Sequence, residues 1–212
     1  GRASTLAISP DFANGGIAFG GEGMGNVQGS AVGLGPHKSS DFGQTWQAQP
    51  SDVANSNPVL DYAFSHDFVS DDTVFAATWG DVLISTDEGE TWQATGAMSG
   101  SVPGFFYRVA AAPEYANSGL VLAGTNYYSE QLYVSRDSGA TWEDPQAVAA
   151  SGDIAFSPDF ANDQTVFAAG EERWQRWSNL GGSIPGTGAG TASTNSRRHR
   201  RCNPQRWHSR HA

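Results

Sequence analysis

An eight-residue pattern, S-x-D-x-G-x-T-W, occurs three times in this chain of 212 residues. Its aspartates, Asp41, Asp87 and Asp137, are 46 and 50 residues apart. Five fixed positions at a near-constant period indicate an internal repeat whose units pack on their neighbours. The fixed residues are Ser39, Asp41, Gly43, Thr45, Trp46, Ser85, Asp87, Gly89, Thr91, Trp92, Ser135, Asp137, Gly139, Thr141 and Trp142.

A second pattern occurs four times, upstream of where each eight-residue box is expected. It contains Asp11-Phe12, Asp67-Phe68, Glu114-Tyr115 and Asp159-Phe160, and a short apolar run follows each copy. Short runs of Val, Ile, Phe and Tyr between Gly, Asp, Asn and Pro favour strands over helices. The unit is therefore predicted as strand, turn, strand, loop, strand, box, strand. In the second unit the strands are predicted at 59–65, 73–78, 81–86 and 91–94.

Four short strands that recur about every 40–50 residues have the period of a β-propeller blade. We therefore predict an all-β segment of four-stranded antiparallel blades, three complete and one partial. The repeat region is residues 1–170, with units at about 5–50, 59–96, 105–145 and 152–170. Such units bury their faces only against neighbours. The expected partners therefore include further blades of a longer parent protein or a second copy of the chain.

Each fixed residue of the box has a structural explanation. An aspartate can accept hydrogen bonds from backbone amides two residues on, and glycine supplies the positive φ that a tight turn needs. Threonine begins the outgoing strand, and tryptophan buries a large ring between neighbouring sheets. The box aspartates are therefore interpreted as structural and not as catalytic.

The first unit is longer than the others because a glycine-rich stretch follows its second strand. Asp11 and Asp41 are separated by 30 residues, whereas Asp67 and Asp87 are separated by 20. The stretch lacks the G-K-[ST] sequence of a phosphate-binding loop and no helix is predicted after it. It is interpreted as a long hairpin.

The three boxes resemble the Asp-box, or BNR repeat, of the sialidase-like β-propeller superfamily, over residues 5–170. That group includes sialidases, xyloglucan-degrading propeller glycosidases, sortilin-type receptors and a photosystem II assembly factor. The upstream pattern most resembles BNR-like repeat proteins of bacterial cell surfaces. The resemblance implies a propeller fold, an extracellular or cell-surface location, and boxes on the rim away from the ligand-binding face.

By the same resemblance, a sialidase needs three arginines to hold the substrate carboxylate. Residues 1–170 contain only Arg2, Arg108 and Arg136, of which Arg136 lies inside a box and Arg2 at the start of the chain. We therefore predict no catalytic residues, and a non-catalytic interaction or carbohydrate-binding module of a secreted or cell-surface bacterial protein. The alternative is a fragment of a propeller glycoside hydrolase, sialidase-like or other, whose catalytic set is incomplete in this chain.

Alignment of the four upstream patterns gives a candidate binding site. The residues six positions before the acidic member of each pattern are Thr5, Asp61, Arg108 and Asp153. All four enter the first strand of a unit, which lines the central channel of a propeller. They are therefore predicted to form an arc at one mouth of the channel, where convergent polar groups can bind a ligand. The other interpretation is that each charge caps a strand or pairs with a neighbour.

Two aromatic residues extend this candidate site. Trp79 follows the second strand of the second unit, and Tyr128 follows the second strand of the third. Loop aromatics can stack on sugar faces, although they can also fill a core. The expected ligands are accordingly glycans or a protein.

The charge distribution separates the repeat from the rest of the chain. Residues 1–170 hold four cations and 20 acidic residues, a net charge of −16, whereas residues 171–212 hold eight arginines and two glutamates, a net charge of +6. An acidic body argues against a nucleic-acid partner. No stretch reaches the ~18 apolar residues of a membrane span. A single cysteine excludes a disulfide framework and a cysteine-based zinc site, and no cofactor or metal is predicted.

The segment 171–212 lacks the fourth box and ends in a basic, glycine- and serine-rich sequence. Such composition cannot form a packed core, so the segment is predicted to be disordered or non-native sequence. Two other interpretations remain, namely a basic arm for an acidic partner and a metal site made of Cys202, His208 and His211.

Overall fold

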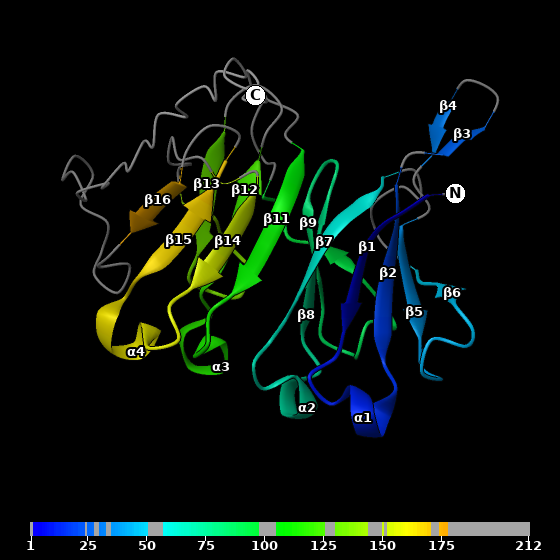
Figure 1. Cartoon of the computed structure of the whole chain (residues 1–212), viewed down its shortest axis with the longest axis horizontal. Coiled ribbons are helices and arrows are strands. Elements are labelled where there is room, and N and C mark those ends of the chain that lie inside the picture. The colour runs from blue at the N-terminus through cyan, green and yellow to red at the C-terminus, as the bar shows by residue number, and fades with distance from the viewer. Residues whose placement is uncertain are drawn as a thin grey trace, which may run out of the picture.

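A computed structural model shows four antiparallel sheets that follow one another along the chain (Figure 1). It describes residues 2–23, 25–27, 30–32, 35–50, 57–97, 105–125, 130–143, 150, 152–170 and 174–177. In each sheet the strands are hydrogen-bonded in sequence order, so one sheet corresponds to one repeat unit. The prediction of an all-β fold made of antiparallel blades is confirmed.

The first sheet contains a hairpin between its second and third strands. The four strands of the sheet are β1 (Arg2–Ile8), β2 (Ala18–Gly23), β5 (Pro36–Ser39) and β6 (Gln47–Ala48). The inserted hairpin pairs β3 (Gly25–Val27) with β4 (Ser30–Val32). It occupies the glycine-rich stretch that the sequence analysis interprets as a long hairpin.

The second sheet follows the predicted strands closely. It consists of β7 (Val59–Phe64), β8 (Val74–Thr78), β9 (Val82–Ser85) and β10 (Gln93–Ala94). All five residues of β8 are buried, because both faces of this strand are covered by neighbouring sheets. Its continuous apolar sequence is typical of a strand buried on both faces.

The third and fourth sheets each have three strands among the described residues. They are β11 (Phe106–Ala111), β12 (Val121–Thr125) and β13 (Gln131–Ser135), then β14 (Asp153–Phe156), β15 (Val166–Ala169) and β16 (Trp174–Trp177). Strand β16 pairs with β15 and lies within the segment predicted as a tail, so the sequence analysis did not anticipate it. Residues 178–212, including the proposed Cys202, His208 and His211 site, lie outside the described residues.

The predicted turn between the first two strands of each unit is a single helical turn. The four turns are α1 (Phe12–Gly15), α2 (Phe68–Asp71), α3 (Tyr115–Ser118) and α4 (Phe160–Asp163). Each ends at a residue in the left-handed conformation, as at Gly16 with φ of 65°. In the first three units the box binds this residue; for example, the Phe42 N–H donates to the Gly16 carbonyl at 3.1 Å. The box and the helical turn therefore hold one end of each of these sheets.

Among the described residues the hydrophobic core consists of three clusters, each between two successive sheets. Strand β1 contacts β7, β7 contacts β11, and β11 contacts β14, so the first strands form one continuous row. Each cluster combines a side chain from the second strand of one sheet with side chains of the next sheet. The central pairs are Phe19 with Tyr62, Phe75 with Tyr115, and Leu122 with Ile154. Stability thus depends on contacts between neighbouring units, as expected for a repeat protein.

Candidate functional site

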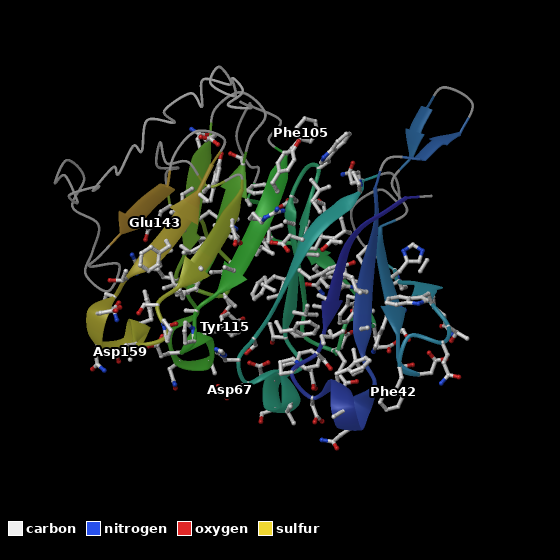
Figure 2. The ribbon with its side chains drawn as sticks, in the orientation of Figure 1. Phe42, Asp67, Phe105, Tyr115, Glu143 and Asp159 are labelled. Atoms are coloured by element: carbon white, nitrogen blue, oxygen red, sulfur yellow. The ribbon has the colours of Figure 1, made fainter. Side chains whose placement is uncertain are left out.

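The sheets have two distinct ends. The helical turns α1–α4 lie at the lower edge in Figure 1, and the first strands begin at the opposite edge, here called the strand-entry end. Figure 2 shows Phe105 at the strand-entry end and Phe42, Asp67 and Asp159 at the helical-turn end. The residues predicted to form the arc lie in the first half of β7, β11 and β14 and at the middle of β1. The three boxes begin at the last residues of β5, β9 and β13.

The strand register supports the repeat alignment that defined this arc. Thr5 pairs with Gly21, Asp61 with Ala77, Arg108 with Gly124, and Asp153 with Ala169, so each faces a small residue. In the first three sheets a bulge directly precedes the arc position, as between Val59 and Asp61. Bulges re-aim side chains and are frequent beside functional sites. The four positions are therefore structurally equivalent.

The carboxylate of Asp61 connects the second sheet to the third. Its Oδ2 accepts a hydrogen bond from the Val109 backbone N–H at 3.1 Å. Burial raises the pKa of Asp61 from 3.8 to about 6, although the Val109 N–H and the Arg108 guanidinium both act to lower it. The nearby Asp153 carboxylate raises it further. The charges of Arg108 and Asp153 thus act in opposite directions on the pKa of Asp61.

Arg108 makes the corresponding connection between the third and fourth sheets. Its Nε donates to the Gly152 carbonyl at 2.7 Å, and a terminal nitrogen donates to the Tyr107 carbonyl at 2.6 Å. Asp153 is exposed, and its Oδ1 accepts from the Ile154 N–H at 2.9 Å. Two of the charged arc residues, Asp61 and Arg108, are therefore held by the backbone of the neighbouring sheet, which fixes their positions. This bonding favours the other interpretation of the arc, in which each charge has a structural role beside its strand.

The raised pKa of Asp61 predicts a specific dependence of stability on pH. Between about pH 4 and about pH 6 the folded chain retains a proton that the unfolded chain releases, so stability falls as the pH rises through this window. We expect a loss of about 2–3 kcal/mol in the free energy of unfolding, from the two-unit shift. In Asp61→Asn, which keeps an oxygen acceptor for the Val109 N–H, the part of this loss that comes from Asp61 should disappear, whereas the contribution of Asp81, whose pKa burial also raises, stays in both proteins. Urea titrations of both proteins across the window test this, and equal pH slopes would contradict it.

An aromatic pair lies at the strand-entry end beside the arc. The Trp79 and Phe105 rings have centroids 4.4 Å apart and an interplanar angle of 57°, and the two residues form an isolated β-bridge. Both side chains are half-buried. The Trp79 Nε1 is buried and has no hydrogen-bond partner among the described residues. Tyr128, the other predicted aromatic, lies outside them.

Asp81 is a residue of this end that the sequence analysis missed. Its carboxylate accepts hydrogen bonds from the backbone N–H groups of Val82 at 2.8 Å, Ala97 at 3.0 Å and Gly96 at 3.1 Å. Burial raises its pKa in spite of these bonds. The aspartate after Gly80, in the turn between β8 and β9, was the available signal. Asp81 fixes the chain that leaves the second sheet.

The box aspartates are fully engaged at the other end. In the first box, Asp41 accepts from the Ser39 hydroxyl at 2.8 Å, the Thr45 N–H at 2.8 Å and the Thr45 hydroxyl at 2.6 Å. The bonds from Thr45 lower the pKa of Asp41 to about 2. The boxes of Asp87 and Asp137 repeat this geometry. Because these carboxylates are already hydrogen-bonded within their own boxes, their role is to stabilise the turns.

In the part of the chain that the structure describes, His, Cys, Asp and Glu side chains form no group of three that could hold a metal ion. Within the same residues, no helix has the length and apolar character needed to cross a membrane.

Comparison with known proteins agrees with the repeat and with the fold. A family model described as BNR/Asp-box repeat matches residues 83–94. Among solved structures, an ancestral GH74 enzyme aligns with a TM-score of 0.61 and 18% identity, over 83% of this chain and 22% of that chain. The GH74 xyloglucanase from Xanthomonas campestris aligns with a TM-score of 0.62 and 16% identity, over 84% and 28%.

A third similar structure is YCF48 from Cyanidioschyzon merolae, with a TM-score of 0.52 and 17% identity, over 93% of this chain and 57% of that chain. No curated protein matches the chain by sequence. The chain thus spans less than a third of the length of the two GH74 structures. At these identities the likeness establishes only the fold, a partial propeller of antiparallel sheets, and leaves the activity open.

Proposed function

We propose that this chain is a non-catalytic binding segment of a secreted or cell-surface propeller protein, with a ligand site at the strand-entry end. The observation that carries the proposal is the Trp79–Phe105 ring pair. Trp79 lies two residues beyond Ala77, the strand partner of Asp61, and Phe105 lies three residues before Arg108. An aromatic platform beside fixed polar groups suits a sugar ring, whose apolar face stacks while its hydroxyls form hydrogen bonds. A glycan is therefore the proposed ligand class.

The hydrogen bonds that Asp61 and the box aspartates make favour a binding role over hydrolysis. Glycoside hydrolysis requires one carboxyl group to act as an acid and a second to act as a nucleophile or base. Asp61 accepts the Val109 N–H, and the box aspartates bind their own turns, so these groups serve the structure. The alternative, a glycoside hydrolase fragment, draws support from the likeness to two GH74 structures.

Binding and turnover should be measured on the same glycans. An array that includes xyloglucan, other β-glucans and sialosides would be probed with the wild type and with Trp79→Ala. We expect binding that weakens at least about fivefold in Trp79→Ala, because stacking on one aromatic ring contributes on the order of 1 kcal/mol or more. Phe42→Ala is the matched control, since it removes an exposed ring from the opposite end of the sheets.

Release of reducing ends from the bound glycans decides between the two functions. Binding without release supports the proposed module. Release of sugar products would establish the hydrolase alternative, and absence of binding to every glycan class would leave the carbohydrate proposal without support.

A further inference from the structure

The exposed large apolar side chains are concentrated on the two outermost sheets. Among the described residues, four of the six belong to the first unit and one to the fourth. They are Leu6, Ile8, Phe42 and Trp46 in the first unit, Val69 on α2, and Phe167 on β15. The two middle sheets, which have a neighbour on each side, contribute only Val69. Exposure of this kind marks an interaction surface.

Phe167 occupies a position that is buried in every other sheet. In all four sheets the equivalent residue lies on the second strand and pairs with an alanine of the first, as Phe167 pairs with Ala155. The equivalents are Phe19, Phe75 and Leu122, all 0% exposed. Each of these packs against the following sheet. Phe167 is 50% exposed, and the described residues include no sheet after the fourth that could cover it.

The contact around Phe19 shows what covers this position. Its ring is surrounded by three aromatic rings of the second sheet: Tyr62 with centroids 5.5 Å apart, Phe64 at 5.7 Å and Trp92 at 5.7 Å. The Trp92 ring is perpendicular to that of Phe19. The receiving face of a sheet is therefore formed by two residues of its first strand and the tryptophan of its box.

The first sheet presents this same receiving face to solvent. By the repeat alignment, Leu6 and Ile8 of β1 and Trp46 of the first box are the equivalents of Tyr62, Phe64 and Trp92. They are 67%, 58% and 41% exposed, whereas Trp92 is 1% exposed. The chain thus carries both halves of one contact. It forms this contact, box tryptophan included, between its first and second and its second and third sheets, and the third and fourth sheets pack in the same way without a tryptophan.

We infer that copies of this chain associate head to tail, with the Phe167 face of one copy packed on the Leu6–Ile8–Trp46 face of the next. The occupant of each face is a second copy, because every copy supplies both halves of the contact. The two faces differ, so the interface is heterologous, and repeated contacts give a closed ring if the rotation between copies closes or an open chain of copies if it does not. The inference is independent of the glycan site at the strand-entry end.

A complementation experiment with two single variants tests this directly. Leu6→Glu places a charge on the Leu6–Ile8–Trp46 face, and Phe167→Glu places a charge on the Phe167 face. Both positions are exposed in the single chain. Sedimentation velocity over a concentration series should show species of two or more wild-type copies. Each variant alone should be monomeric, with its apparent dissociation constant weakened at least about 100-fold, because a buried charge without a partner is strongly disfavoured. An equimolar mixture of the two variants should form a dimer, since each supplies the face that the other lacks.

Two controls keep the result decisive. Val69→Glu places the same charge at an equally exposed apolar residue away from both faces and should associate like the wild type. Leu6→Ser and Phe167→Ser remove apolar area without adding charge and should also weaken association, which covers the case of a misfolded glutamate variant. A wild type that stays monomeric over the whole series would overturn the inference. So would a Phe167→Glu protein that still dimerises alone, because that protein would be using its first sheet on both sides.

Discussion

Replacement of Trp92 by alanine is expected to lower the free energy of unfolding by about 3–5 kcal/mol, the range for deletion of a large buried aromatic side chain. The Trp92 ring is 1% exposed and packs against Phe19 of the preceding sheet and Tyr62 of its own. Its Nε1 donates to the Gly89 carbonyl at 3.1 Å. The substitution would leave a cavity between the first two sheets. Urea unfolding followed by circular dichroism measures the change.

The chain contains its own control for this prediction. Trp46 is the same residue in the same motif and donates in the same way to the Gly43 carbonyl, at 3.2 Å, but it is 41% exposed. Trp46→Ala is therefore expected to cost about 1 kcal/mol. The comparison is best made in the Phe167→Glu background, where association between copies does not contribute. Equal losses for the two tryptophans would show that the motif itself, and not the inter-sheet contact, carries the energy.

Introduction of a methyl group at Gly124 is expected to have the second large effect. A Cβ at this position would overlap the backbone carbonyl oxygen of Ala150, which belongs to the chain entering the fourth sheet. A backbone oxygen cannot rotate away as a side chain can, so the third and fourth sheets would have to separate. We expect Gly124→Ala to cost about 3 kcal/mol or more, at the upper end of the range for overpacking.

Gly15→Ala serves as the matched control for the effect of adding a methyl group. The nearest atoms to a Cβ at Gly15 are the Ile17 side-chain carbons at 3.8 and 3.9 Å, which is ordinary contact. This variant should be neutral or more stable by about 0.5 kcal/mol, because alanine loses less backbone entropy on folding than glycine does. Thermal unfolding of both variants tests the pair. A Gly124→Ala protein as stable as Gly15→Ala would mean that the two sheets are not packed as described.

Most strands of each unit could be predicted from local sequence, whereas the helical form of the four turns and the strand β16 could not. Strand β7 ends one residue before its predicted limit and β8 begins one residue after, which is the expected precision at strand ends. The helical turns α1–α4 were predicted only as turns, since four residues are too few to show helical periodicity. Strand β16 was missed because its sequence lies in a basic segment, and it is identified only by its pairing with β15.

At the candidate site, too, the sequence predicted one property of the arc residues and not another. Their equivalence followed from counting along the repeat, and the strand register supports it. The hydrogen-bond partner of Asp61 could not be predicted from the sequence, since the Val109 N–H is 48 residues away on another sheet. The raised pKa of Asp61 could not be predicted either, because it arises from burial of the carboxyl group between sheets. Local sequence specifies which residues are equivalent, and packing specifies their environment.

The sequence by itself determined that the chain is a repeat of antiparallel sheets, because the box, the turn glycine and the apolar runs act within one unit. The tertiary structure decided which copies of the same residue are buried. Trp92 and Phe19 lie inside a contact, while their equivalents Trp46 and Phe167 lie at the two outer faces. The physical reason is that the hydrophobic effect stabilises a side chain only when another surface removes it from water, and that surface belongs to a neighbouring sheet.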